Sequence, residues 1–262
     1  ITTSYADGSE ATKMHGMYDK SIVARTVNNL DTYYIYDDLG NLRYILPPAI
    51  TSQLTNNNNY NDGDDLIRNY AYVYRYDKYG NLIYKRLPGA EENYMVYDKA
   101  GRLVLQQDGN QRTRGNLWLM TKYDDYGRAI YVQECDMSNW NYMNLLDTIS
   151  KISFTETYAP ASASVKLGNT GYTNILFAMP NSKVLVINYY DNYDFLDLLS
   201  TNKISLLKKK KEKGYGQRYD NALGLATGSI TYNLSDNQYT ITTNYYDIHG
   251  NIIQARNTSL QG

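Results

Sequence analysis

The chain has 262 residues and a formal net charge of −1, because 26 Lys and Arg residues nearly balance 27 Asp and Glu residues. That balance excludes a global electrostatic attraction to nucleic acid or to an anionic membrane surface. Tyrosine dominates the aromatic residues, with 30 Tyr against 3 Phe and 2 Trp, which favours sheet faces that bury a ring and keep its hydroxyl near water.

The first part of the chain has the pattern of strands and turns. A strand-like stretch over 2–5 is followed by a turn at Asp7-Gly8, and residues 21–27 alternate weakly as a second strand would. Residues 33–46 then hold two strand-like arms around Asp37-Asp38-Leu39-Gly40. The sequence therefore predicts a β-hairpin over 33–46.

An Asn- and Asp-rich stretch over 56–65 invites comparison with a calcium-binding loop. The EF-hand spacing fails, because a frame with its glycine at Gly63 puts Tyr60 at a ligand position and Asn69 where a glutamate is required. We therefore predict a solvated surface loop.

A short phrase then recurs at 76–82, 97–103 and 123–129: an aromatic residue, Asp, two variable residues, Gly, Asn or Arg, and an apolar residue. The Asp can accept hydrogen bonds from the backbone of a type I turn, and the Gly three residues later can take a positive φ. Flanking arms rich in aromatic and β-branched residues predict a hairpin closed by a glycine bulge. The complete copies give these structural turn residues: Tyr36, Asp37, Gly40, Tyr76, Asp77, Gly80, Tyr97, Asp98, Gly101, Tyr123, Asp124, Gly127, Tyr246, Asp247 and Gly250.

The rhythm of the repeat breaks after Tyr131, and residues 135–183 form a predicted insertion. One short amphipathic helix is expected in it, packed on the sheet and capped by Ser138 or Asn139. Its apolar stripe recurs every three residues, at Trp140, Met143, Leu146 and Ile149.

Two degenerate copies of the phrase follow. In the first, which includes Asp191, Asp194 stands where the turn glycine belongs, and Asp tolerates positive φ better than most residues. Residues 195–199 can begin a helical turn, and the lysine run over 208–213 predicts a solvated loop. The second copy, over 219–224, has its glycine one place later than the complete copies.

Successive hairpins pair most easily with their neighbours, and strand twist makes a long antiparallel ribbon curl. We therefore predict an all-β chain with minor α content, built as one long curved antiparallel sheet. It forms a single segment over 1–262, with regular repeats at 1–134, the insertion at 135–183, and degenerate and final repeats at 184–262.

The repeated phrase resembles the YD repeat of the Rhs (rearrangement hotspot) family, which teneurins and the shell subunits of insecticidal toxin complexes share. Residues 34–48, 87–90, 95–99 and 107–111, together with Gly171-Tyr172-Thr173-Asn174, look like the large Bacteroidetes type. The resemblance implies a hollow shell in a secreted or cell-surface protein, whose partners are the remainder of its own chain and a C-terminal effector or toxin. The self-cleaving core segment of many such shells has no match here, so no self-cleavage is expected.

No catalytic, cofactor-binding or metal-binding residues emerge, and we expect no enzyme. His15 and His249 lie in unrelated contexts, and Cys135, the only cysteine, has no basic neighbour and is expected to be packed. Turn capping accounts for every repeated aspartate, whereas acid–base catalysis would use at most two of them. These aspartates are Asp37, Asp77, Asp98, Asp124, Asp191, Asp220 and Asp247.

Two functional hypotheses remain. A wall segment of an Rhs-type shell predicts a sheet face without a discrete pocket, whereas a glycan-binding or adhesion module predicts clustered, exposed tyrosines.

The chain has no apolar run long enough for a membrane span and no signal-peptide pattern, so we expect an excerpt of a longer protein. Exposed edge strands also predict self-association.

Overall fold

Antiparallel strands dominate the chain in this computed structural model, which describes residues 31–54, 60–159, 170–179, 182–199, 201–210, 219–233 and 237–258. Every strand pair with a defined register is antiparallel. The prediction of an all-β chain with minor α content is therefore confirmed. The strands predicted over 2–5 and 21–27 lie outside the described residues, as does His15.

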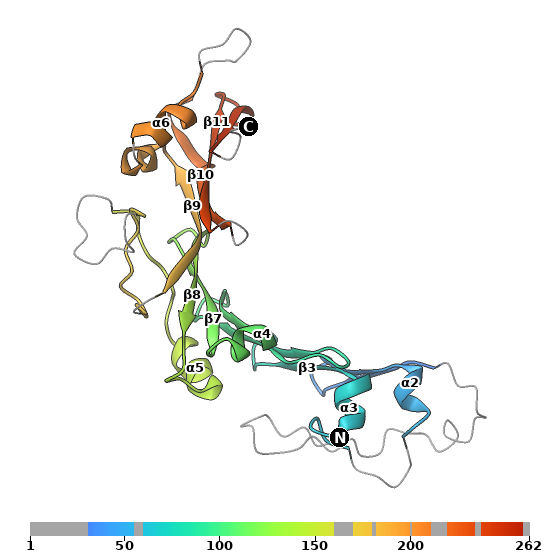
Figure 1. The fold of residues 1–262 in the computed structure, drawn as a ribbon. Helices are drawn as coiled ribbons and strands as arrows, with labels where there is room; N and C mark the ends of the chain where they lie inside the picture. The colour runs from blue at the N-terminus through green and yellow to red at the C-terminus, as the bar shows by residue number, and fades with distance from the viewer. Residues whose placement is uncertain are drawn as a thin grey trace. The chain divides into compact units, whose positions relative to one another are not determined.

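Twelve strands occur in the described residues, most of them short (Figure 1). They are β1 (Tyr33–Tyr36), β2 (Leu42–Leu46), β3 (Tyr72–Tyr76), β4 (Leu82–Arg86), β5 (Asn93–Tyr97), β6 (Leu103–Gln107), β7 (Leu117–Tyr123), β8 (Ala129–Asp136), β9 (Lys183–Asp191), β10 (Ala222–Asn233), β11 (Gln238–Tyr246) and β12 (Ile252–Asn257). The helices are α2 (Pro48–Thr51), α3 (Asp65–Tyr70), α4 (Gly109–Thr113), α5 (Tyr142–Ile149), α6 (Thr201–Leu207) and the 3-10 helix η1 (Asp194–Leu198).

Contacts divide the chain into two compact units. The first comprises Ile1–Trp118 and Met137–Ile152, and the second comprises Leu119–Asp136 and Ser153–Gly262. Within each unit the strand order follows the chain order. The predicted insertion over 135–183 is therefore divided between the two units. The single-segment organisation over 1–262 stays a prediction.

The core of the first unit lies where α2 and α3 cover the first strands. Buried residues of this core are Tyr44, Leu46, Ile50, Tyr60, Ile67, Ala71 and Val73. The predicted solvated loop is only partly correct, because its end packs on the sheet. The Asp62 carboxylate accepts a hydrogen bond of 2.7 Å from the Tyr44 hydroxyl and forms an ion pair with Arg75. The backbone carbonyl of Asp62 accepts a hydrogen bond of 2.6 Å from Arg86. Residues 56–59 of this stretch lie outside the described residues.

Helix α5 is the helix predicted in the insertion, but it begins later than its sequence suggested. Its N-cap is Asn141, whose side chain accepts from the Asn144 N–H at 2.8 Å, and not Ser138 or Asn139. The buried stripe consequently shifts to Leu145 and Ile149, while Met143 is exposed. The first helical residue, Tyr142, lies against the rings of Tyr94 and Trp118 at centroid distances of 4.5 and 6.2 Å.

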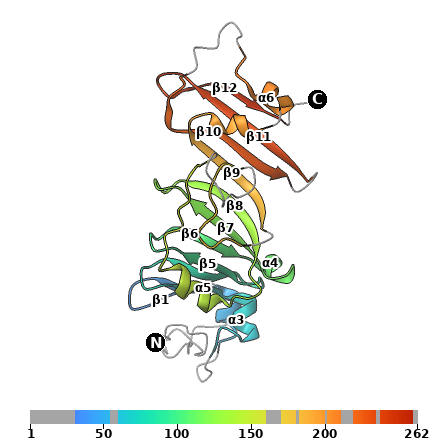
Figure 2. The same cartoon turned by 90° about the vertical axis from the view of Figure 1, so that its left-hand side faces the viewer.

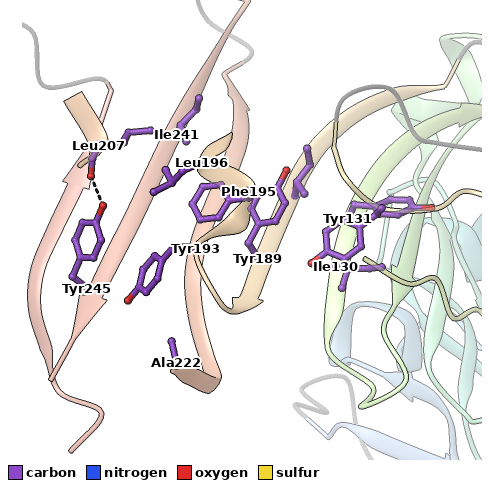
Figure 3. Close-up of a cluster of buried hydrophobic side chains, with 12 residues drawn as sticks. Ile130, Tyr131, Tyr189, Tyr193, Phe195, Leu196, Leu207, Ala222, Ile241 and Tyr245 are labelled. Carbon is purple, nitrogen blue, oxygen red and sulfur yellow. Dashed lines mark hydrogen bonds between the residues drawn. The ribbon is translucent and has the colours of Figure 1, made fainter. Parts of the chain in front are cut away.

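The second unit has the larger continuous core, which η1 and α6 help to cover (Figures 2 and 3). Phe195 of η1 stacks on Tyr189 of β9, with centroids 4.3 Å apart and planes 9° from parallel. Tyr245 of β11 is fully buried and donates its hydroxyl proton to the Leu207 carbonyl at 2.7 Å (Figure 3). The hydroxyls of Tyr131, Tyr172 and Tyr189 likewise donate to backbone carbonyls.

Neither degenerate copy of the phrase forms the predicted hairpin turn. Asp194 begins η1, and the residue with positive φ is Asp191 at +72°. The second copy enters strand β10, where Gly224, at φ +81°, lies at an irregularity of the register between Ala222 and Ala226. In the first copy, Asp194 belongs to η1, whose Phe195 packs in the core. In the second copy, the residues from Ala222 onward pair with β9 as part of strand β10. Neither segment therefore forms a hairpin turn.

Candidate functional site

The five complete copies of the phrase share one turn geometry. In each, the glycine has a φ between +74° and +83°. The glycine N–H donates to the carbonyl of the Asp, and the N–H of the Asp donates to the carbonyl of the residue four positions later, at distances of 2.9 to 3.1 Å. The register is irregular at Tyr36, Tyr76, Tyr97 and Tyr246, the aromatic residue that opens the phrase. The turn glycines are Gly40, Gly80, Gly101, Gly127 and Gly250.

Each turn aspartate directs both carboxylate oxygens into its own turn. In the second copy, Oδ1 of Asp77 accepts from the N–H groups of Tyr79 and Asn81 at 2.8 and 2.9 Å, and Oδ2 accepts from the Asn81 amide at 2.9 Å. Asn41 and Asn251 repeat this arrangement at Asp37 and Asp247. Arg102 and Arg128 replace the amide at Asp98 and Asp124.

These hydrogen bonds favour the ionised carboxylate. At Asp247 the N–H and side-chain amide of Asn251 lower the pKa of the carboxyl group below its ordinary value. At Asp37 burial opposes the shift, but hydrogen bonds from Asn41 and Leu39 outweigh it and lower the pKa. A carboxylate that is ionised has no proton to deliver, and the turn hydrogen bonds already occupy most of its acceptor sites.

A pocket of about 170 Å³ lies in the second unit, next to the turn that begins at Tyr123. Its lining includes five tyrosines, which are Tyr126, Tyr158, Tyr172, Tyr189 and Tyr190, and four carboxylates. The hydroxyl of Tyr158 is buried, and it has no hydrogen-bond partner among the residues that the structure describes. Sequence reasoning for a shell wall predicted a face without a discrete pocket, and this unit differs from that prediction.

Arg128 organises one side of the pocket. Its guanidinium donates to both carboxylate oxygens of Asp191 at 2.9 and 2.7 Å and to Asp124 at 2.6 Å. The same group lies over the rings of Tyr190 and Tyr126, 4.3 and 5.0 Å from their centroids. The hydrogen bond from Arg128 lowers the pKa of Asp191. Asp191 therefore joins two segments of the sheet and does not cap a turn of its own, which corrects the assignment made from the sequence.

A second polar cluster, the enclosed cluster, is buried next to the pocket, and its Glu156 also lines that pocket. The side chains of Lys122 and Glu156 are 0% and 1% exposed, and Lys122 Nζ lies 2.8 Å from Glu156 Oε1. Lys122 Nζ also donates to Asn174 Oδ1 at 3.2 Å and to the Leu176 carbonyl. The Tyr131 hydroxyl lies 3.3 Å from the same Asn174 oxygen.

Glu156 holds the 170–179 segment against this cluster. Its carboxylate accepts from the Thr173 hydroxyl at 2.6 Å and from the N–H groups of Ile175 and Leu176, each at 2.9 Å. Burial lowers the pKa of Lys122, although Glu156 opposes the shift. Burial would raise the pKa of Glu156, but hydrogen bonds from Lys122 and Thr173 lower it. The Gly171-Tyr172-Thr173-Asn174 motif thus supplies partners to a buried ion pair.

The sequence did contain a signal for this cluster. Strand β7 alternates strictly, and Lys122 occupies the inward series that begins with Trp118 and Met120. A lysine at an inward position requires a buried anion or acceptor, because an unpaired buried charge is too costly. The sequence did not identify Glu156 as that partner, because Glu156 lies 34 residues further along the chain and outside the strands of the sheet.

Cys135 is buried, and burial raises the pKa of its thiol to about 12, so it is a packed and unreactive residue at neutral pH. Among the described residues, no three His, Cys, Asp or Glu side chains gather as metal ligands would. No described helix combines the length and apolar character needed to cross a bilayer.

No family model and no curated protein matches the chain. Among solved structures, the crystal structure of TcdB2-TccC3 is similar over 88% of this chain and 8% of its own, with 11% identity and a TM-score of 0.39. A structure of the Photorhabdus luminescens Tc holotoxin pore is similar over 88% of this chain and 10% of its own, with 13% identity and a TM-score of 0.30. The chain thus spans a tenth or less of each matched chain.

Proposed function

We propose that this chain is a non-catalytic structural segment of an Rhs-type shell that encloses or presents a C-terminal effector or toxin. The observation that supports the proposal is the turn geometry. In every complete copy, the aspartate side chain accepts a hydrogen bond from a backbone N–H of its own turn. The repeated residues are therefore used for architecture. The shell part of the proposal rests on the resemblance of the phrase to the YD repeat.

The partners in this proposal are the remainder of the same chain and its effector, and the location is secreted or cell-surface. The wall acts on no external substrate and needs no cofactor. Antiparallel hairpins suit the role, because consecutive strands satisfy each other's backbone groups and leave side chains free to face an enclosed domain.

Limited proteolysis of the full-length parent tests this proposal. We expect the intact parent to protect its C-terminal domain, and deletion of residues 70–132, which removes three of the repeated turns, to expose that domain. The isolated C-terminal domain serves as the control for its intrinsic sensitivity to the protease. Equal cleavage of the C-terminal domain in the intact and the deleted parent would contradict enclosure.

The pocket favours a second candidate, a glycan-binding module. Tyrosine rings can stack on sugar faces, and the carboxylates and Arg128 could orient hydroxyl groups. Tyr126, which lines the pocket, is 79% exposed, and Tyr79 is 73% exposed at the same position of another turn, outside the pocket.

This pair of tyrosines gives a matched test. If the chain binds glycans here, calorimetric titration shows saturable binding that Tyr126→Ala weakens about tenfold, which corresponds to about 1.4 kcal/mol. Tyr79→Ala should leave the affinity unchanged. A titration without saturation, or equal losses in the two variants, removes the glycan candidate and leaves the wall.

A further inference from the structure

Three side chains from separate segments of the second unit meet in the enclosed cluster. Lys122 comes from β7, Glu156 from the stretch after α5, and Asn174 from the 170–179 segment, 52 residues beyond the lysine. Lys122 and Glu156 are sealed from solvent, and Asn174 is 8% exposed. An amine, an amide and a carboxylate are thereby held together in a buried site.

The distances bring the amine close to the amide carbon. Lys122 Nζ is 3.2 Å from Asn174 Oδ1, and a C=O bond of about 1.23 Å places the amide carbon about 4 Å from the amine. That separation is slightly beyond the near-attack range of about 3 to 3.5 Å. A shortening of about 0.5 Å would bring the two atoms within that range.

We propose that Lys122 and Asn174 form an intramolecular isopeptide bond, with Glu156 as the proton-transfer group, so that the second unit is covalently stapled. The proposal does not depend on the shell function. It assigns a self-modification site to residues that the repeated phrase does not include.

The reaction balances within the cluster. Glu156 accepts one proton from the Lys122 ammonium, which frees the lone pair on Nζ. Nζ attacks Asn174 Cγ, the Nζ–Cγ bond forms, and the Cγ–Nδ2 bond breaks. Glu156 returns its proton to the departing Nδ2, and the proton displaced from Nζ leaves with it, so that ammonium departs with the original positive charge. No oxidant, metal or further reactant is required.

Each neighbour favours one of these steps. Desolvation favours the neutral amine, which is the nucleophilic form of lysine. The Phe154 and Tyr131 rings lie 5.5 and 6.0 Å from Nζ and contribute to the desolvated surroundings. The Tyr131 hydroxyl lies 3.1 Å from the Thr173 carbonyl and 3.3 Å from Asn174 Oδ1, so it can turn its proton from the carbonyl to the Asn174 oxygen as negative charge develops there. The Leu176 carbonyl keeps an acceptor for the amine throughout.

The competing account is a permanent ion pair. An ammonium on Lys122 has three protons, and Glu156, Asn174 and the Leu176 carbonyl offer three acceptors. Such a cluster would also be satisfied without any bond formation. The two accounts differ in covalent mass, which makes them separable by one measurement.

Intact-mass spectrometry of the purified, folded chain is that measurement. We expect a mass lower than that of the sequence by one ammonia. Tryptic digestion should yield a branched peptide that joins residues 115–128 to residues 167–183, because acylated Lys122 is no longer a cleavage site. A folded chain of full mass with separate peptides overturns the proposal and leaves the ion pair alone.

Variants separate the roles. Lys122→Met and Asn174→Ala should both have full mass, and Glu156→Gln should lose at least 90% of the linked product. Asn174→Asp is the matched control, since attack on a carboxylic acid would release water, and its mass should fall by one water. A normal yield of linked product in Glu156→Gln would overturn the role of the carboxylate. Circular dichroism of each variant establishes that it is folded before its mass is compared.

Discussion

Replacing Gly228 by alanine should lower the free energy of unfolding of the second unit by roughly 1 to 3 kcal/mol, the cost typical of an overpacked core. Gly228 is buried in β10 beneath Phe195 of η1. A Cβ atom at this glycine would lie 2.2 Å from Phe195 Cζ and 2.7 and 2.9 Å from the two adjacent ring carbons. The ring would have to move, and it is stacked on Tyr189.

Thermal unfolding followed by circular dichroism measures this effect, with an expected fall in Tm of about 2 to 4 °C for each kcal/mol. Ser229→Ala is the control, because the next residue of a strand points to the opposite face. Adding Phe195→Leu to Gly228→Ala should restore part of the loss by making room for the methyl group. Equal Tm values for Gly228→Ala and Ser229→Ala would show that the ring does not hold η1 against β10.

The turns were predictable because their chemistry is local. Asp, the intervening residues and Gly supply the donor, the acceptor and the positive φ within five positions, so the phrase folds in the same way wherever its arms can pair. The start of α5 was less predictable. Ser138, Asn139 and Asn141 are all residue types that cap helices, and in the structure Asn141 is the N-cap while Tyr142, the first helical residue, packs against Tyr94.

The rest of the site depends on contacts between segments far apart in sequence. Asp191 stands in the same local phrase as the turn aspartates, yet Arg128, 63 residues earlier, binds it and Asp194 enters η1. The alternation of β7 indicated that Lys122 faces inward, but a periodic pattern does not show which residue will pair with it. Sequence patterns therefore identified the repeated architecture and missed the pocket and the enclosed cluster, which tertiary pairing creates.

Replacing a turn glycine by valine should cost on the order of 1 to 3 kcal/mol, the range for a residue held in an unfavourable φ/ψ region. Gly80 and Gly101 have φ of +83° and +74°, and a Cβ at either position would meet no atom within 4 Å. The expected loss therefore reports backbone conformation alone, in contrast to the steric clash at Gly228. A β-branched residue is the most strained replacement at positive φ.

Chemical denaturation of five single variants of the first unit tests this expectation. Gly80→Val and Gly101→Val should lower the free energy of unfolding by the amount given above, whereas Lys78→Val and Lys99→Val, in the same two turns, should change it by no more than about 0.5 kcal/mol. Gly80→Asn should lose less than Gly80→Val, because asparagine tolerates the left-handed region. Equal unfolding midpoints for the glycine and lysine variants would show that the repeated turn does not require a residue that tolerates positive φ.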